Sequence, residues 1–359
     1  YKRQSLDIRR YERAVSQGAQ NRRGKNMAVT LKQVAKRAGV SASAVSRTFT
    51  KGASVSEKTR KKVESAAAAM GYSPNFLARS LTTRRTKMIG LVSNNFHNPI
   101  FLEVFDLFTR GLQECDLRPL LVNLTDQTDP EASVQMLRQY SVDGVIVASS
   151  TLPPSFAKSF RDANMPVVHA FGRGSAKPLV HVVGIDNVEC GRIAGRELAR
   201  RGYNRVGFLG GPAIATSTRD RFDGFIEELS NHPKIEVSHS FATAYSFEAG
   251  RTEMGRLLAQ KTPSEAYFCG DDVLSIGALS AISSAGLSVP SDIGLIGLND
   301  MEIAGWENIA LTTIHQPIAK IVSSAIELIL ATLEHPDRAP EARLFSCHVV
   351  ERQTLRPAL

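Results

Sequence analysis

The sequence lacks the long apolar stretches of a membrane or exported protein. No run of about eighteen apolar residues occurs, so the sequence predicts no membrane span. The first 26 residues are basic but contain no apolar signal-peptide core, which favours a cytoplasmic protein. The four cysteines (Cys115, Cys190, Cys269 and Cys347) are far apart and form no CxxC pair. We therefore expect reduced thiols.

Motifs of the common enzyme classes are also missing. The chain contains no GxGxxG, GxxxxGK[ST], HExxH or GxSxG. Its eight histidines, among them His97, His169, His181 and His315, show no metal-ligand spacing. The sequence therefore indicates no catalytic residue, no metal site and no cofactor, and we expect a protein that is not an enzyme.

Acidic residues are scarce in the first 90 residues. That segment has 21 Lys and Arg against four acids, a net charge of +17, whereas the remaining 269 residues carry a net charge of −8, and together these make the +9 of the chain. A basic segment on a mildly acidic body suggests a polyanion partner for the N-terminal part alone. A solubilising tail would explain the charge equally well, so the residue pattern has to decide.

That pattern predicts three short helices within residues 30–71. Leu31, Val34 and Ala35 recur at helical spacing before Gly39, and Ser41 can cap a second helix. A third helix fits residues 57–70, between a capping serine and a terminating glycine. Helix, glycine turn and helix form a helix-turn-helix pattern.

The linker that follows, SPNFLARSL (73–81), is unusually apolar. Ser73 and Pro74 form a helix-start signature, but about two turns are too few for a stable isolated helix. Leu77 and Leu81 share one face, so two copies could pack together in a symmetric dimer.

From Met88 onward, short apolar runs alternate with amphipathic helical stretches. MIGLVS, DGVIVAS and HVVGI are examples of the runs, and RVGFLG near residue 206 restarts the series. Continuous apolar strands that alternate with helices predict parallel sheets covered on both faces, here in two lobes. The cleft at the carboxyl ends of the strands is a natural site for a small ligand.

Particular strings add a family resemblance. VAKRAGVSASAVSR, VSEKTR and GYSPNFLARSL in the N-terminal part resemble the lactose/galactose repressor (LacI/GalR) family of bacterial transcription regulators. NNFHNPIFLEVF, RDRFDGF, FCGDDVLSIGAL and LTTIHQP resemble its effector domain and periplasmic sugar-binding proteins. The resemblance implies a helix-turn-helix domain (28–72), a hinge helix and linker (73–87) and a two-lobed effector-binding and dimerisation body (88–355). We expect residues 1–26 to be a disordered basic extension.

The resemblance also implies DNA-contacting residues. The second helix would lie in the major groove, where Arg47 could bind guanine through two hydrogen bonds and Ala42 and Ser43 would face other base edges. Candidate phosphate contacts are Thr30, Ser41, Ser46, Lys58 and Arg60. In the hinge, Leu81 matches a leucine that wedges into the minor groove, and Asn75, Ala78 and Arg79 match its neighbours.

The effector residues implied by the resemblance are Phe101, Phe171, Asp186, Ser217, Arg221, Tyr245, Asp271 and Asn299. Asn299 departs from the family, in which aspartate is commoner, and this leaves room for an anionic ligand as well as for a neutral sugar. The aromatic residues favour a sugar or sugar acid. Ala215, where the purine-binding branch has arginine, disfavours a purine. Trp306 is expected either in the core or as a platform in the pocket.

The function predicted from these features is that of a DNA-binding transcription regulator of the repressor type. It would bind a near-palindromic operator as a homodimer in the cytoplasm, associated with the nucleoid, under the control of a small effector. A solute-binding protein of sugar transport or chemotaxis is the alternative, but the helix-turn-helix segment would then be unexplained. An architectural DNA protein with a degenerate pocket is a second alternative, which Arg221 and Asp186 argue against.

Overall fold

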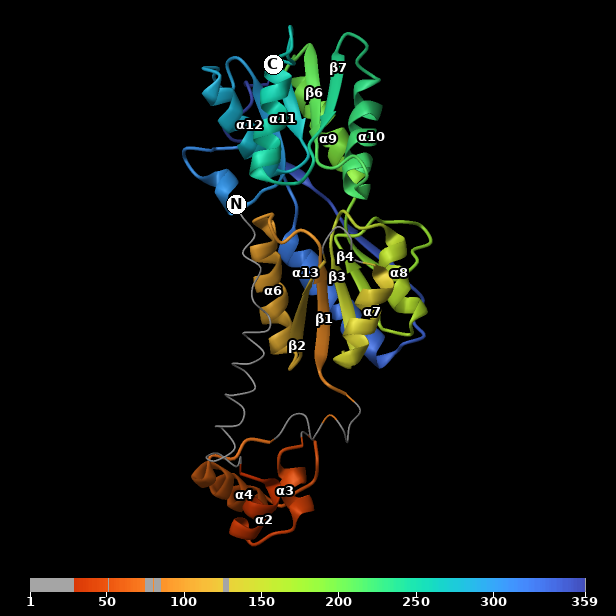
Figure 1. The fold of residues 1–359 in the computed structure, drawn as a ribbon, viewed down its shortest axis with the longest axis vertical. Coiled ribbons are helices and arrows are strands. Elements are labelled where there is room, and N and C mark those ends of the chain that lie inside the picture. Colours follow the sequence, from red (N-terminus) through yellow and green to blue (C-terminus); the bar gives the residue numbers. More distant parts are fainter. Residues whose placement is uncertain (1–28, 51, 75–79, 81–84, 125–128, 359) are drawn as a thin grey trace, which may run out of the picture. The chain divides into compact units, whose positions relative to one another are not determined.

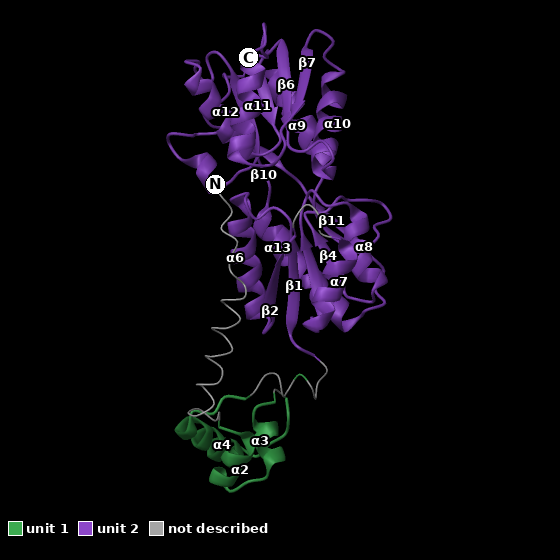
Figure 2. Cartoon of the chain, in the orientation of Figure 1, with its two compact units in different colours: residues 1–84 green, residues 85–359 purple. Residues whose placement is uncertain are grey.

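The computed structural model describes residues 29–50, 52–74, 80, 85–124 and 129–358. The chain divides into two compact units, residues 1–84 and 85–359 (Figure 2). None of the helices among the described residues combines the length and the apolarity needed to cross a membrane.

The described part of the N-terminal unit contains three full helices: α2 (Leu31–Ala38), α3 (Ala42–Thr48) and α4 (Glu57–Met70). Their shared core contains Val34, Val45 and Val63, all fully buried. Gly39 ends α2 with a φ of 66°, a conformation that costs glycine little, and Gly71 ends α4 in the same way with a φ of 62°. The sequence prediction of a helix-turn-helix followed by a third helix is confirmed.

The larger unit has two lobes, each with a six-stranded sheet (Figure 1). The first sheet has the order β11-β5-β4-β3-β1-β2, and the second has the order β12-β10-β9-β8-β6-β7. All neighbouring strands are parallel except β10 and β12, which are antiparallel. The predicted two-lobed parallel α/β body is confirmed.

In the first lobe, α6 and α13 cover one face of the sheet and α7 and α8 cover the other (Figure 1). Each face is sealed by its own apolar cluster, because the central strands are buried on both sides. The elements are β1 (Met88–Ser93), α6 (Ile100–Glu114), β2 (Arg118–Asn123), α7 (Pro130–Gln139), β3 (Gly144–Ala148), α8 (Pro154–Asp162), β4 (Val167–Ala170), β5 (His181–Ile185), α13 (Ile318–Glu334) and β11 (Ala342–Phe345).

In the second lobe, α9 and α10 lie on one face of the sheet and α11 and α12 on the other. Its first strand begins at Arg205, as the restart in the sequence predicted. The elements are α9 (Asn187–Arg200), β6 (Arg205–Gly210), α10 (Thr216–Leu229), β7 (Glu236–Phe241), α11 (Phe247–Leu258), β8 (Ala266–Cys269), α12 (Asp272–Ser284), β9 (Gly294–Asn299), the 3₁₀ turn η1 (Glu302–Gly305), β10 (Thr313–His315) and β12 (His348–Val350).

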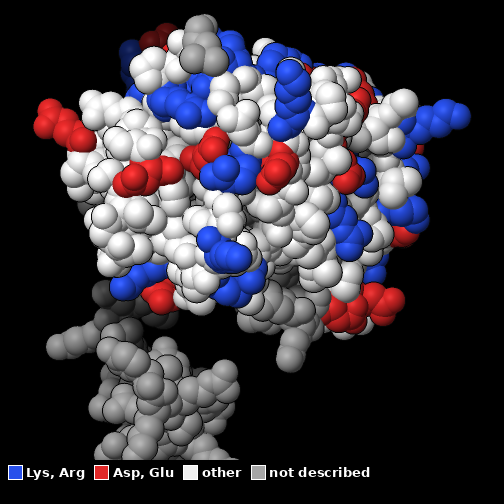
Figure 3. Space-filling model, turned by 90° about the horizontal axis from the view of Figure 1, so that it is seen from above, with Lys and Arg blue, Asp and Glu red and all other residues white. Residues whose placement is uncertain are grey.

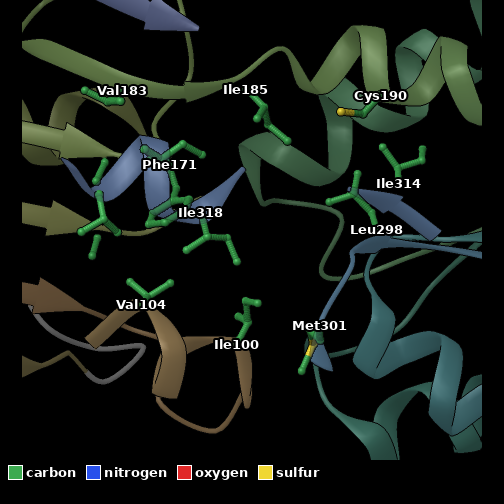
Figure 4. Packing of buried hydrophobic residues seen from close by; sticks show 14 of the residues in the cluster. Ile100, Val104, Phe171, Val183, Ile185, Cys190, Leu298, Met301, Ile314 and Ile318 are labelled. Carbon is green, nitrogen blue, oxygen red and sulfur yellow. The ribbon is translucent and has the colours of Figure 1, made fainter. Parts of the chain in front are cut away.

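The chain passes between the lobes three times. The first crossover lies between β5 and α9, the second between β10 and α13, and the third between β11 and β12. One buried apolar cluster runs through this region and joins residues of both lobes, for example Ile185 and Ile318 with Leu298 and Ile314 (Figure 4). The lobes are therefore connected by apolar packing at the crossovers as well as by the backbone.

The sequence prediction for Trp306 was wrong. This side chain is 53% exposed, just after η1, and it is neither in a core cluster nor among the residues that line the cleft. The neighbouring Ala304 and Leu311 fill the buried positions of that loop instead.

Candidate functional site

The exposed side of α3 is the first candidate surface. Ala42, Ser43, Ser46 and Arg47 are all exposed on this helix, whereas Val45 and Thr48 point into the core. The Thr48 hydroxyl donates a hydrogen bond to the Ala44 carbonyl oxygen at 2.9 Å, so its partner lies within the same helix. The base-reading residues predicted from the sequence thus share one accessible helix face.

Two of the predicted phosphate contacts are helix caps. Thr30 forms a capping box with Gln33, and the Ser41 hydroxyl accepts a hydrogen bond from the Ala44 amide at 3.2 Å. Helix N-termini present free amide groups that suit phosphate oxygens. Both residues therefore place such amides at the surface whether or not their own side chains touch DNA.

The basic candidates on α4 differ from each other. Lys58 is exposed, whereas Arg60 is partly buried and its Nη1 donates to the Thr48 carbonyl oxygen at 2.9 Å. Arg60 therefore links α4 to the end of α3. Only the N–H groups of its guanidinium that do not bond Thr48 can donate to a phosphate. The hinge candidates Asn75, Ala78, Arg79 and Leu81 lie outside the described residues.

The second candidate site is a small cavity between the two lobes. It has a volume of about 40 Å³ and lies at the carboxyl ends of the parallel strands, where such sheets place their ligands. Six of the eight predicted effector residues line it: Phe101, Phe171, Arg221, Tyr245, Asp271 and Asn299.

Arg221 is the buried cation of this cavity. Its Nε donates to Asn187 Oδ1 at 2.8 Å and its Nη1 to the Gly270 carbonyl oxygen at 2.5 Å. The close approach of α9 and α10 requires glycine at position 191, since a Cβ atom there would lie 2.1 Å from the Arg221 carbonyl oxygen. Two hydrogen bonds and tight backbone packing thus fix the guanidinium before any ligand arrives.

Asp271 is the buried anion. Its Oδ2 accepts from Asn98 Nδ2 at 2.6 Å and its Oδ1 from the Leu274 amide at 2.9 Å. Burial raises the pKa of the Asp271 carboxyl to about 6, although these hydrogen bonds and the positive charge of Arg221 oppose the shift. The bond to Asn98 also joins the lobes, because Asn98 precedes α6 of the first lobe.

Aromatic side chains form the apolar walls. Phe101 packs against Phe105 with ring centroids 5.7 Å apart, and the Tyr245 hydroxyl hydrogen-bonds Thr218 Oγ1 at 2.7 Å. Phe171 is 8% exposed and has a φ of 63°, which is strained for a bulky residue. Rings held in this way provide stacking surfaces beside the charged groups.

Asn299 ends β9 at a strained turn, and several charged groups hold the residues that follow. Its φ is 130° and that of Asp300 is 61°. Asp300 pairs with Arg352 at 2.6 Å and with His315 Nδ1 at 3.0 Å. Asp272 accepts from the Met301 amide at 2.8 Å. The position of Asn299 therefore depends on an ionic network beneath the cavity.

Two predicted effector residues do not line the cavity. Asp186 is exposed and caps α9, accepting from the Val188 and Glu189 amides at 3.0 and 3.1 Å. Ser217 is 1% exposed and its hydroxyl has no hydrogen-bond partner among the described residues. The residues that sequence reasoning missed are Asn95, Asn98, Ile100, Val104, Ser150 and Gln316. Asn95, Asn98, Ile100 and Val104 fall in the motif NNFHNPIFLEVF, and Gln316 falls in LTTIHQP.

A wider chamber of about 670 Å³ adjoins the cavity and shares Asn95 and Tyr245 with it. Among the described residues, its remaining lining comes from both lobes and contains no charged side chain: Asn94, Leu124, Thr151, Leu152, Pro153, Phe156, Pro212, Ile214, Ala215, Thr216, Thr243 and Ala244. The charged inner cavity therefore adjoins a chamber whose described lining is neutral and largely apolar.

Two further polar contacts bridge the lobes beside the cleft. Thr216 Oγ1 donates to the Ser150 carbonyl oxygen at 3.2 Å. Arg173 and Asp220 form an ion pair at 2.7 Å, without the alignment of a hydrogen bond. Burial raises the pKa of the Asp220 carboxyl, and the positive charge of Arg173 opposes that shift. Lobe movement must break or rearrange such contacts.

One face of the larger unit is mixed in charge. On the face shown in Figure 3, basic and acidic side chains are interspersed. This fits the net charge of −8 beyond residue 90 and leaves the excess of basic groups to the N-terminal segment.

Two family models match the chain, one for each unit. Residues 30–75 match the model described as bacterial regulatory proteins, lacI family, and residues 196–355 match a periplasmic binding protein-like domain. A transcriptional repressor PurR of Proteus mirabilis is 34% identical over 335 residues, which are 91% of this chain and 96% of that protein. The chain belongs to the lacI family. Another relative, a PurR of Escherichia coli O139:H28, is 33% identical over 331 residues and covers the same shares of the two chains.

Solved structures agree with this family assignment. The lac repressor dimer bound to operator and the anti-inducer ONPF superposes with a TM-score of 0.82 at 25% identity, covering 92% of this chain and all of that one. The regulator CelR in complex with cellobiose gives a TM-score of 0.66 at 26% identity, over 91% of this chain and 99% of that one. This lacI-family member is a DNA-binding transcription regulator under small-molecule control, not an enzyme. The alternative of a solute-binding protein has no support.

Proposed function

We propose that this lacI-family protein is a cytoplasmic repressor whose dimer binds a near-palindromic operator and responds to a sugar or sugar acid. One observation carries the proposal: the chain joins an accessible recognition helix with Arg47 to an interlobe cavity with a fixed Arg221 and Asp271. Residues 28–72 form the DNA-binding domain, 73–87 the hinge and 88–355 the effector and dimerisation body.

On the DNA side, Arg47 is the main base-reading residue. It is the only long side chain among Ala42, Ser43 and Arg47, so it supplies most of the direct sequence discrimination through guanine. Ala42 contacts a thymine methyl group and Ser43 is weakly selective. Thr30, Ser41, Ser46, Lys58 and Arg60 position the helix on phosphates. In the hinge, Asn75, Ala78, Arg79 and Leu81 contact the minor groove.

On the effector side, the ligand is polar at one end. Arg221 donates to a hydroxyl or carboxylate of the ligand, while Asn98, Asp271 and Asn299 contact its hydroxyl groups. Phe101, Phe171 and Tyr245 stack on its apolar faces. Asp186 and Ser217 join this set only if the lobes rearrange on binding, since neither lines the present cavity. The neutral chamber accommodates the remainder of a ligand larger than the inner cavity.

Coupling between the two sites follows from linkage. An effector that changes the angle between the lobes must alter the contacts Asn98–Asp271, Thr216–Ser150 and Arg173–Asp220. If the operator-bound dimer prefers one angle between the lobes, bound effector changes the affinity for DNA. Bound DNA then changes the affinity for effector by the same factor.

Selection of bound DNA from a random pool, with and without candidate sugars and sugar acids, tests the proposal. We expect an enriched near-palindrome whose recovery changes with one class of metabolite. In Arg47→Ala, we expect weaker binding by about 1–3 kcal/mol and relaxed preference at one position in each half-site. The matched control is Lys58→Ala, which should weaken all sequences alike and lower the salt dependence.

Calorimetry with the same metabolites separates the two halves of the proposal. Binding that is lost in Arg221→Met and kept in Arg173→Met would place the ligand in the inner cavity. A pool without an enriched palindrome would refute the operator proposal, and the absence of binding to every sugar and sugar acid would refute the effector proposal.

A further inference from the structure

A further cavity lies within the first lobe, beside the loop that joins β4 to β5. Its volume is about 420 Å³, which is in the usual range for a small-molecule site. Its described lining comes from the start of α8, from β4 and β5, and from the loop residues between Arg173 and Val180. None of these residues lines the inner cavity or the wider chamber. It is therefore a separate space, which we call the loop cavity.

The loop cavity is lined by positive charge. Arg173 and Lys177 are both exposed and both line it, and no acidic side chain does so among the described residues. Lys177 forms no ion pair with a described residue. Arg173 pairs with Asp220 of the second lobe through Nη2, but 53% of its side chain is exposed, so its other N–H groups can donate to a ligand. Two such cations favour an anion.

The start of α8 favours an anion as well. Pro154 is the first residue of α8 and lines the loop cavity. The helix has no side-chain cap and no acid in its first turn. Its first amides therefore receive no hydrogen bond from a capping side chain, and the positive end of the helix dipole lies at the cavity.

His169 supplies a buried hydrogen-bond acceptor. Its side chain is fully buried and lines the loop cavity, and its Nε2 lies 2.9 Å from the Ser149 carbonyl oxygen. Because a carbonyl oxygen only accepts, Nε2 carries the proton and Nδ1 is an acceptor. Nδ1 has no hydrogen-bond partner among the described residues. A Cβ atom at Gly172 would lie 2.8 Å from Nδ1, so glycine leaves that edge of the ring free of a side chain.

The imidazole of His169 stays neutral in this position. Burial lowers its pKa to about 4, although the hydrogen bond to Ser149 opposes the shift. A buried acceptor without a donor costs free energy, so a ligand that brings a hydroxyl to Nδ1 is favoured. A bare anion would satisfy the cations and leave this acceptor unpaired.

The loop that forms the cavity is held at both ends. The Phe171 amide donates to the Val183 carbonyl oxygen at 2.6 Å, and Arg161 Nη1 donates to the Leu179 carbonyl oxygen at 2.6 Å. The walls therefore keep their places before a ligand binds, which lowers the entropy lost on binding.

We propose that the loop cavity is a second ligand site, which binds a polyol phosphate or sugar phosphate. The phosphate lies against Arg173, Lys177 and the start of α8, because a phosphate monoester carries nearly two negative charges at pH 7. A hydroxyl group of the same ligand donates to His169 Nδ1. The apolar side chains of Leu179 and Val180, which also line the cavity, contact the C–H faces of the ligand.

Ligand in the loop cavity would also act on the lobes. Arg173 belongs both to this cavity and to the interlobe ion pair with Asp220 at 2.7 Å. A phosphate that accepts hydrogen bonds from Arg173 competes with Asp220 and so weakens a contact between the lobes. Removal of the Asp220 charge should therefore strengthen phosphate binding.

Calorimetry with the full chain tests the proposal. The probes are sorbitol 6-phosphate and ribose 5-phosphate, compared with hexyl phosphate, which lacks hydroxyl groups, and with sorbitol, which lacks the phosphate. We expect at least one of the first two to bind, and hexyl phosphate and sorbitol to bind at least about tenfold more weakly. Absence of binding to both sugar and polyol phosphates would overturn the proposal, and equal binding of hexyl phosphate would overturn the role of His169.

Three variants locate the bound phosphate. Lys177→Met should weaken binding about tenfold, and Asp220→Asn should strengthen it severalfold. The matched control is Lys158→Met, because Lys158 lies on α8 but does not line the cavity. Equal losses in Lys177→Met and Lys158→Met would overturn the site, and unchanged or weaker binding in Asp220→Asn would overturn the competition with Asp220.

Arg221→Met separates this site from the proposed effector site. We expect phosphate binding to persist in this variant, since Arg221 lines only the inner cavity of the two. Phosphate binding that is lost in Arg221→Met and kept in Lys177→Met would overturn the second site and assign the phosphate to the inner cavity. Failure of sugars and sugar acids to bind the inner cavity would leave these measurements unaffected.

Discussion

Replacing Asp272 by asparagine should stabilise the protein at alkaline pH and have much less effect at acidic pH. The Asp272 side chain is fully buried. Burial is the main reason that the pKa of its carboxyl is raised to about 7, and the negative charges of Asp271 and Asp300 add to the shift. The hydrogen bonds donated by the Thr313 hydroxyl and the Met301 amide lower the pKa and oppose the shift. Asparagine can keep both contacts, accepting from the Met301 amide and donating to the Thr313 hydroxyl, which rotates to accept.

The sign follows from proton binding. The folded protein holds the Asp272 proton between pH 3.8 and about 7, where the unfolded chain has lost it, so stability falls as pH rises through that window and then levels off. A shift of about three pKa units corresponds to about 4 kcal/mol at full ionisation. Between pH 5 and pH 8 the advantage of Asp272→Asn should therefore grow by about 3 kcal/mol.

Urea unfolding followed by circular dichroism at both pH values measures this difference. The matched control is Asp337→Asn, because Asp337 is exposed and the substitution removes the same charge. The contributions of all other titrating groups to the unfolding free energy are the same in wild type and variant, so they cancel in the difference. An advantage of the asparagine variant that is the same at pH 5 and pH 8 would refute the reasoning, since it would mean that Asp272 does not titrate in this range.

Three further predictions concern packing, the hinge and the effector. A Cβ atom at Gly224 would lie 1.9 Å from the Val188 carbonyl oxygen, so Gly224→Ala should destabilise the protein by about 3 kcal/mol or more, while Gly255→Ala, with open space around it, should stabilise by about 1 kcal/mol in thermal unfolding. Leu81→Ala should weaken operator binding by about 1–3 kcal/mol in a DNA titration and leave effector binding unchanged; equal operator affinity would contradict the wedge. Asn299→Asp should weaken binding of a sugar acid about tenfold in calorimetry and spare a neutral sugar, and the same loss for both would rule out an anionic ligand.

The central strands of both sheets were predictable because they are buried on both faces. Runs such as MIGLVS and HVVGI coincide with β1 and β5. β7, β11 and β12 were missed. Each is an edge strand with partly exposed residues and a mixed polar sequence, as in EVSHSF of β7, so its apolar signal is weak.

The candidate site was predictable only in part. Arg221, Asp271 and the aromatic walls came from the resemblance in their motifs, and the structure brings them together. The same reasoning predicts Asp186 in the wall, yet its carboxylate accepts hydrogen bonds from the Val188 and Glu189 amides at the start of α9. Trp306 shows the same limit for an apolar residue, since hydrophobicity alone does not say which side of a loop faces solvent.

The sequence by itself determined the local elements: the capped helices of the N-terminal unit, the excess of basic charge there and the doubly buried strands. These follow from interactions within a few residues, such as the Thr30 capping box or the left-handed turn at Gly39. Only the tertiary structure decided what meets in the cleft and at the crossovers. Asn98 and Asp271 are 173 positions apart, and Thr216 and Ser150 are 66 apart. Their contacts exist because three chain crossings bring the strand ends of two lobes together, and no local pattern encodes that geometry.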